Sequence, residues 1–385
     1  MSGKRRRERG VVAVTAALGL FVLLGIAALA VDLGMLIAAR TQLETAADAA
    51  ALAAAKELAF GARDHALRRA EEYAHHNLVL GEPVVLRPGN RNAPEDVVLG
   101  FYDLATHTFR PEDLLPNAVE VTTRRTQNRA TAVPTFFAAV FGRREVNVSA
   151  HSIAIGFPRE IVPAIDASGS MGEDANCNGT PGNPAIVPAR EAAAEFIRDI
   201  SFSTLPEHAG MLSFSRHAVV RAPIKGLHDA GQPDDLIRRT LRIEASPCGA
   251  EGATNTGEAI QRAIRMFEEA SPGPGTSGFS QRLIILLSDG LANRDAFDND
   301  YYPYDQFRDG NPAWRYAVDS AAEARELNIT VHTIQLGNLD RGPQERQMRE
   351  IAAAGGGMYL FAPTTEQLDE MFETLARHVQ VALVD

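Results

Sequence analysis

The sequence is poor in several residue types whose scarcity excludes whole classes of protein. Of its 385 residues only two are cysteines, which excludes a disulfide-rich scaffold and a zinc site built from four thiolates. Its 38 lysines and arginines are outnumbered by 49 aspartates and glutamates, so the formal net charge is −11. Such a chain lacks the positive surface that nucleic-acid binding requires, and we expect no nucleic-acid partner. The rest of the composition, 45% hydrophobic and 23% charged, excludes a disordered or fibrous chain.

Common catalytic motifs are also missing. No GxxxxGK[ST], HExxH or GxSxG segment occurs, so nucleotide hydrolysis, zinc proteolysis and α/β-hydrolase chemistry have no support. Residues 273–278 satisfy GxGxxG, but they follow a predicted helix and precede a predicted strand. A dinucleotide-binding motif needs the opposite order, so we expect no nucleotide site there.

One long uncharged stretch is present near the N-terminus. No charged side chain occurs from Gly10 to Val31, and basic residues cluster at positions 4–9. An apolar helix of about 20 residues crosses the roughly 30 Å hydrocarbon core of a bilayer. We therefore predict a transmembrane helix over residues 10–32, with residues 1–9 in the cytoplasm and the rest of the chain exported. The alternative is a signal peptide cleaved near Ala30, although signal cores are usually shorter than this stretch.

Two regions follow the predicted span. Residues 33–82 predict an extended alanine-rich stem helix, because 35–60 contains no glycine or proline; Gly61 can interrupt this helix. Residues 83–157 predict a small α+β module. Half-buried strands are expected at 119–126 and 146–155, and one short apolar helix is expected at 133–141.

The N-terminal segment resembles a known family. Residues 9–34 and 40–53, the latter reading RTQLETAADAAALA, are similar to the start of TadE/TadG-type Flp pilus-assembly proteins. The order of strand, apolar segment and strand in the module is similar to the membrane-distal part of TadG-like proteins. This resemblance implies a single-pass protein of the bacterial inner membrane, with a cytoplasmic N-terminus and the bulk of the chain periplasmic or extracellular.

The second half of the chain, residues 159–385, alternates strand and helix patterns after a boundary at 157–159. Such alternation predicts an α/β domain with a mainly parallel sheet flanked by helices. The aliphatic run 283–287 is typical of a strand buried on both faces. The other strands are expected at 161–165, 209–214, 218–224, 329–336 and 358–361, and the helices at 190–200, 234–243, 256–269, 313–327, 344–354 and 366–379.

Three polar motifs lie where predicted strands end or helices begin: DASGS at 166–170, GATNT at 252–256 and LSDG at 287–290. Ligands of open α/β sheets bind at the carboxyl ends of strands, so we expect these side chains to meet. Hydroxyls and carboxylates supply only oxygen ligands, which suit Mg²⁺, Mn²⁺ or Ca²⁺ better than zinc. With only two carboxylates, the metal would seek an acidic oxygen from outside, which favours adhesion over hydrolysis.

These motifs resemble the metal-ion-dependent adhesion site of von Willebrand factor A domains. Asp166, Ser168 and Ser170 match the family's Asp-x-Ser-x-Ser, Thr254 its threonine, and Asp289 its later aspartate. The resemblance implies that the three hydroxyls bind the metal directly and that the two aspartates often act through water.

Together the resemblances imply a membrane-anchored, non-enzymatic Tad pilus-assembly or adhesion protein. Its domain would bind a divalent cation, Mg²⁺ first, and through it an acidic group on a protein partner such as a pilus subunit, an envelope protein or a surface receptor. The alternative is a regulatory subunit working with a cytosolic AAA+ ATPase. A metal-dependent phosphatase has less support, because no general base or phosphate cradle is visible near the motifs.

Several loop features carry further expectations. Cys177 and Cys248 lie in loops expected at the same rim of the sheet. Because an exported domain lies in an oxidising compartment, we predict that the two cysteines form a disulfide. Pro163, inside the first predicted strand, predicts a bulge or local break. Residues 174–185 begin like an EF-hand, but Ala185 replaces the required glutamate. The acidic loop 295–309 could bind calcium or a partner, and a solvated loop is the simpler interpretation.

Overall fold

A computed structural model gives the structure of the chain. It describes residues 2–58, 60, 63–87, 96–111, 115–172, 184–247, 252–270, 280–290, 292–294, 311–337, 342–378 and 380–384, with only the backbone for residues 2–14, 365 and 366. Both cysteines, the GxGxxG segment and the acidic loop lie outside these ranges. The predictions made for them, including the Cys177–Cys248 disulfide, therefore stay predictions.

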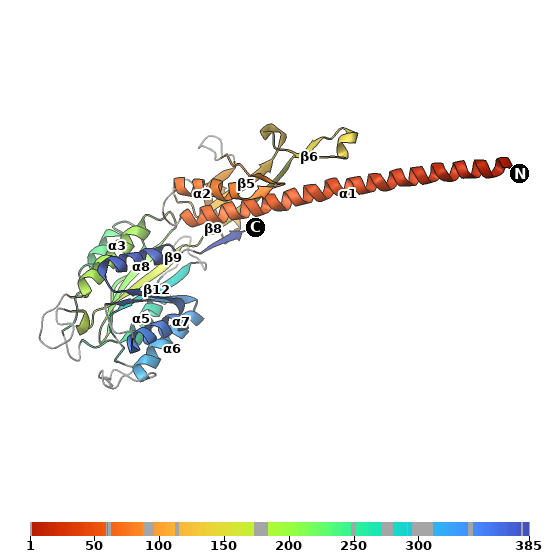
Figure 1. Cartoon of the computed structure of the whole chain (residues 1–385). Helices are drawn as coiled ribbons and strands as arrows, with labels where there is room; N and C mark the ends of the chain where they lie inside the picture. Colours follow the sequence, from red (N-terminus) through yellow and green to blue (C-terminus); the bar gives the residue numbers. More distant parts are fainter. Residues whose placement is uncertain are drawn as a thin grey trace.

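A single helix dominates the N-terminal part. α1 (Ser2–Leu58) runs for 57 residues and projects far from the rest of the molecule (Figure 1). By length and composition it can cross a membrane: over Thr15–Leu58 its most apolar window has a mean hydropathy of 2.6 and is 11% buried. A second helix, α2 (Arg63–His76), follows and packs on α1 through small buried residues such as Ala66 and Ala70. The predicted long apolar helix is confirmed.

The second half of α1 covers an antiparallel sheet. This sheet has the strand order β15-β8-β5-β3-β4, and its strands are β3 (Val97–Asp103), β4 (Thr108–Pro111), β5 (Ala118–Arg125), β8 (Val148–Gly156) and β15 (Val381–Val384). Leu43 and Leu58 of α1 share one buried cluster with Val119 and Val121 of β5. The Thr123 hydroxyl also donates to the Leu43 carbonyl oxygen at 2.9 Å. The stem helix is therefore an integral part of this module.

The module also contains several short strands and 3-10 helices. They are β1 (Leu78–Val79), β2 (Glu82–Pro83), the 3-10 helix η1 (Gln127–Arg129), β6 (Val133–Pro134), the 3-10 helix η2 (Ala138–Phe141) and β7 (Glu145–Val146). The apolar helix predicted at 133–141 is thus reduced to η2, because residues 133–134 pair with β7 instead. It ends at Gly142 as predicted, where φ is +86°, a conformation that favours glycine.

The C-terminal domain is built on a six-stranded sheet of order β11-β10-β9-β12-β13-β14. All neighbours are parallel except β10 and the edge strand β11, which pair antiparallel. The strands are β9 (Arg159–Asp166), β10 (His208–Phe214), β11 (Ala218–Gly226), β12 (Gln281–Ser288), β13 (Ile329–Leu336) and β14 (Gly356–Ala362). The predicted α/β class and mainly parallel sheet are confirmed.

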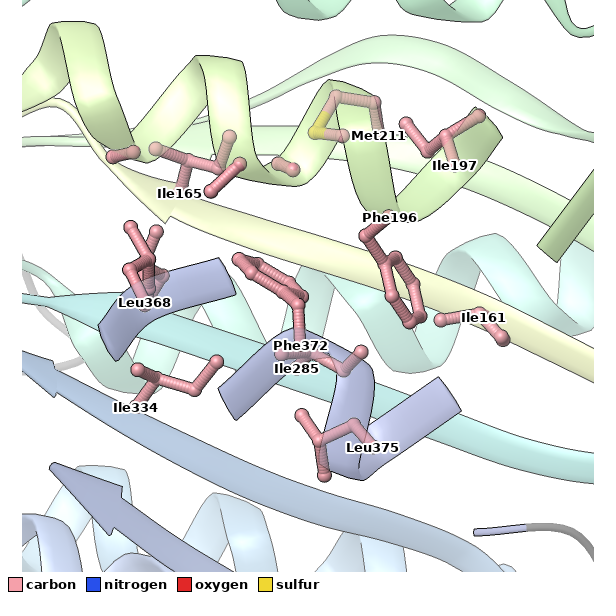
Figure 2. Close-up of a cluster of buried hydrophobic side chains, with 14 of the residues drawn as sticks. Ile161, Ile165, Phe196, Ile197, Met211, Ile285, Ile334, Leu368, Phe372 and Leu375 are labelled. Atoms are coloured by element: carbon pink, nitrogen blue, oxygen red, sulfur yellow. The ribbon is translucent and has the colours of Figure 1, made fainter. Parts of the chain in front are cut away.

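Helices cover both faces of this sheet (Figure 1). One face carries α3 (Ile186–Ser201), α4 (Asp234–Thr240) and α8 (Thr365–Ala376), and the other carries α5 (Thr256–Glu269), α6 (Pro312–Glu326) and α7 (Pro343–Ala354). Figure 2 shows Leu368, Phe372 and Leu375 of α8 packed over Ile285 and Ile334 of the strands. These two apolar layers hold in place the strand ends that carry the polar motifs.

Two details differ from the sequence-based picture. Pro163 causes no break in β9, which stays in register with β12 from Arg159 to Ile165; proline removes only one donor, and the other residues keep the ladder. The last strand, β15, pairs antiparallel with β8 of the module sheet although it follows the C-terminal domain in sequence. The chain end therefore returns to the stem.

Candidate metal centre

The first motif forms a tight turn at the carboxyl end of β9. Asp166 is the last residue of this strand, and its Oδ1 accepts a hydrogen bond of 2.8 Å from the Ser168 backbone N–H. Ser168 then precedes the short 3-10 helix η3 (Gly169–Met171), which carries Ser170. This turn aims the aspartate and both serine hydroxyls at the same edge of the sheet.

The other two motifs meet the first at this edge. The Ser170 hydroxyl lies 3.0 Å from that of Ser168 and donates to Asp289 Oδ1 at 2.8 Å. A Cβ built on Gly290 would lie 3.4 Å from Thr254 Oγ1, 3.5 Å from Ser170 Oγ and 3.9 Å from Asp166 Oδ2. All five sequence-predicted residues are therefore brought together, although they span more than a hundred positions of the chain.

Burial divides the cluster into a floor and a rim. Asp166, Ser168 and Thr254 are at most 3% exposed, whereas Ser170 and Asp289 are partly exposed. Only the rim side is accessible to an external group.

The two carboxylates lie in an unfavourable electrostatic environment. Burial and the neighbouring Asp289 raise the pKa of Asp166 to about 7, although hydrogen bonds from Ser288 and Ser168 lower it in part. Burial also raises the pKa of Asp289 to about 6. In the described part of the chain no lysine or arginine forms an ion pair with either aspartate. A bound cation would relieve this repulsion, so the donor set fits a metal ion.

The chemistry of the donors points to a hard cation. Among the described residues, hydroxyl and carboxylate oxygens converge here, and such oxygen ligands suit a hard cation. Asp166, Ser168, Ser170, Thr254 and Asp289 would hold the ion, which would supply a positive charge for an acidic ligand.

Supporting residues that the sequence analysis did not single out position the site. The Ser288 hydroxyl donates to Asp166 Oδ2, and the Asn293 side chain accepts from the Thr254 backbone N–H at 2.7 Å. Gln344, from the start of α7, donates to the Asp289 carbonyl oxygen at 2.8 Å. Ser288 stands inside a recognised motif and could have been inferred. Asn293 and Gln344 carry no local signal, because only the fold brings them here.

Close backbone approach also shapes the site. A Cβ on Gly252 would lie 2.4 Å from the Pro247 carbonyl oxygen and 2.9 Å from the Gly169 amide nitrogen. Glycine at this position therefore lets the second motif pack directly on the first. Asn255 then caps α5 by accepting from the Glu258 N–H, which fixes Thr254 one residue before the cap.

A mainly parallel α/β sheet with Asp-x-Ser-x-Ser, threonine and aspartate at its carboxyl edge defines a von Willebrand factor A-type domain. The family model described as von Willebrand factor type A domain matches residues 160–374, and the chain belongs to this family. Two further models match the N-terminal half: putative Flp pilus-assembly TadE/G-like over 10–57 and putative Tad-like Flp pilus-assembly over 37–154. The protein is thus a Tad pilus-related protein with a C-terminal A-type domain.

Solved structures are similar to part of this chain at low identity. The vWF domain of the type V pili tip protein Mfa5 from Porphyromonas gingivalis is 15% identical, with a TM-score of 0.42, covering 58% of this chain and 95% of its own. BatB from Bacteroides thetaiotaomicron is 20% identical, with a TM-score of 0.39, covering 57% and 98%. Proximal thread matrix protein 1 from the mussel byssus, with a zinc-occupied MIDAS motif, is 14% identical, with a TM-score of 0.40, covering 61% and 50%. No curated protein matches the chain.

Proposed function

We propose that this protein is a membrane-anchored, non-enzymatic component of Tad pilus assembly or adhesion. Its A-type domain binds Mg²⁺, or Mn²⁺ or Ca²⁺ in its place, and through the metal an acidic group on a protein partner. The observation that supports this most directly is the convergence of Asp166, Ser170 and Thr254 oxygens around one point at Gly290. The partner would be a pilus subunit, an envelope protein or a surface receptor.

The composition of the site supports binding rather than catalysis. Three of the five proposed ligands are neutral hydroxyls, so two carboxylates only just balance a divalent charge. The metal would keep affinity for a further anionic oxygen. Within the described residues, no histidine, cysteine or third carboxylate hydrogen-bonds to the five side chains.

Metal binding is tested first, on the full chain in detergent. We expect Mg²⁺ at a hundredfold excess over its Kd to raise the free energy of unfolding by about 2.7 kcal/mol, measured by thermal unfolding and calorimetry. The substitution D289N should abolish this gain, because it removes one of only two anionic ligands. Asp319 lies exposed on α6, so D319N is the matched control and should behave as wild type. Equal Mg²⁺ binding by D289N would contradict the site.

Partner binding is tested separately. Proteins that co-purify with the wild-type chain from cell membranes in Mg²⁺ should be lost both in chelator and with D166A. Circular dichroism should show that D166A remains folded. A set of partners unchanged by chelator and by D166A would overturn the adhesion mechanism while leaving metal binding intact.

Orientation separates this proposal from its alternative. Anchoring by α1, with residues 1–9 in the cytoplasm of a bacterial cell and the rest of the chain beyond the inner membrane, excludes a cytosolic ATPase as partner. A phosphatase reporter fused after Asp385 should be active and a cytoplasmic β-galactosidase reporter inactive. The reverse result would favour the AAA+ regulatory subunit.

A further inference from the structure

A loop of the module is tied to α1 where the uncharged stretch ends. Asp32, the first acidic residue after that stretch, is only 3% exposed. Its carboxylate accepts backbone hydrogen bonds from Phe136, Phe137 and Ala138 at 2.9, 3.0 and 2.8 Å. Ala28, one turn nearer the N-terminus, is 6% exposed although neighbouring Leu29 is 66% exposed. The hairpin of β6 therefore lies beside α1 and covers this face of the helix (Figure 1).

The loop itself is closed and well defined. We call residues 135–144 the apolar loop. Hydrogen bonds join its two ends, from the Thr135 N–H to the Arg144 carbonyl oxygen at 2.9 Å and from the Arg143 N–H to the Ala138 carbonyl oxygen at 3.0 Å. Gly142, with φ of +86°, turns the chain back toward β7. These hydrogen bonds and the turn at Gly142 hold the loop closed.

Apolar side chains cover the outer surface of this loop. Phe136 is 65% exposed, Phe137 43%, Val140 80% and Phe141 89%. Such a group of large apolar side chains marks an interaction surface. It continues the exposed apolar surface of α1, on which Leu24 is 61% exposed.

The position of the loop selects a lipid surface as its occupant. Because a helix rises about 1.5 Å per residue, Ala28 lies about 6 Å nearer the bilayer centre than Asp32, and interfacial segments bury their apolar side chains about 5–10 Å deep. The exposed Arg143 and Arg144 stand at the base of the loop, where they suit lipid phosphates. The buried Asp32 carboxylate accepts hydrogen bonds from backbone N–H groups, which lowers the free-energy cost of placing this charge at the membrane boundary.

We infer that the apolar loop inserts into the interface of the bilayer that α1 crosses, on the exported side. This inference rests on the anchoring proposed above. The protein then contacts the membrane at two points, the helix and the loop, which fixes the rotation and tilt of α1. The stem and the A-type domain would be held at a set angle to the membrane rather than swinging from a single helix.

The test uses tryptophan fluorescence of the full chain in phosphatidylethanolamine–phosphatidylglycerol liposomes that contain phosphatidylcholine brominated at acyl carbons near the interface. The native Trp314 is 2% exposed inside the C-terminal domain and gives a constant background. F141W places a probe on the apolar loop, and L24W places one on the helix. F202W is the matched control: Phe202 is 67% exposed beside Thr204, which hydrogen-bonds to Leu58 at the far end of α1.

We expect the added emission of F141W and L24W to be quenched several-fold more than that of F202W. Adding D32A to F141W should reduce the quenching, because the loop loses its three hydrogen bonds to α1. Quenching of L24W without quenching of F141W would overturn the inference and leave the anchor intact. Shielding of F141W from aqueous iodide without lipid quenching would show a protein on the loop instead, and would also overturn it. Absence of quenching in L24W would overturn both proposals.

Discussion

At the scale of single residues, the site and the core place polar groups where water cannot reach them. Asp166 is such a group at the proposed site, and Asp289 beside it is partly buried; burial is the main cause of the raised pKa of both carboxyls. His332 is also buried, but it belongs to no proposed site. It is 2% exposed in the middle of β13, and its Nδ1 accepts from the Met358 N–H at 3.0 Å.

The histidine makes the stability of the domain pH-dependent. Burial, and then the nearby His378, lower the pKa of His332 to about 4 from an ordinary 6.5. Below pH 6.5, His332 is therefore protonated in the unfolded chain but stays neutral in the folded chain. The free energy of unfolding falls as the pH is lowered to about 4. The full loss is on the order of 3 kcal/mol. Denaturant titrations across this range should show a shallower decline for H332N, which keeps an acceptor for Met358 but does not titrate. Equal slopes would contradict the assignment.

At the scale of elements, most of the C-terminal helices and strands begin and end within a few residues of the predicted ranges. The α5 helix and the β13 strand coincide with them. Periodicity succeeded because these elements bury one defined face or, in the central strands, both faces. It failed at 133–141, where Val133 is buried in a short strand while Phe136, Phe137, Val140 and Phe141 face outward, so no core imposes a helical period.

Helix α8 tests the importance of one such buried face. Phe372 is 2% exposed, and its ring centroid lies 5.1 Å from that of Phe196 on α3 (Figure 2). F372A should lower the free energy of unfolding by about 3–5 kcal/mol, because it leaves a cavity between two helices and the sheet. F202A, at an exposed position, should change it by about 0.5 kcal/mol or less. Trp314 is the single tryptophan and reports on unfolding of this domain. Equal effects of the two substitutions would contradict the packing.

At the scale of the whole molecule, stem, module and A-type domain are joined through buried polar contacts. Thr204, between α3 and β10, donates from its hydroxyl to the carbonyl oxygens of Leu58 and Pro116 at 2.9 and 3.1 Å. Arg159 begins β9 just after the boundary and pairs with Glu207 at 2.7 Å, both at most 1% exposed. Its Nη1 also reaches the Ala376 carbonyl oxygen at the end of α8.

Breaking this buried pair should weaken the base of the domain. E207A leaves the Arg159 guanidinium without its carboxylate, and we expect a loss of about 3–5 kcal/mol in the free energy of unfolding. The exposed pair of Arg377 and Glu373 provides the control, since E373A should cost about 1 kcal/mol or less. Replacing both buried partners together, as R159M with E207L, should cost less than E207A alone, because no buried charge is left unpaired. A double variant as unstable as E207A would contradict this account.

The sequence by itself determined the apolar N-terminal helix, the order of strands and helices, and the five proposed metal ligands. Each of these depends on local composition, on periodicity or on a short motif at a strand end. The tertiary structure alone decided the rest. It brought Asn293 and Gln344 to the site, returned β15 to the module sheet, and tied the 135–144 loop to Asp32. These are contacts between residues far apart in the chain, and no local pattern encodes such partners. The expected absence of a nucleic-acid partner and the Cys177–Cys248 disulfide both stay predictions.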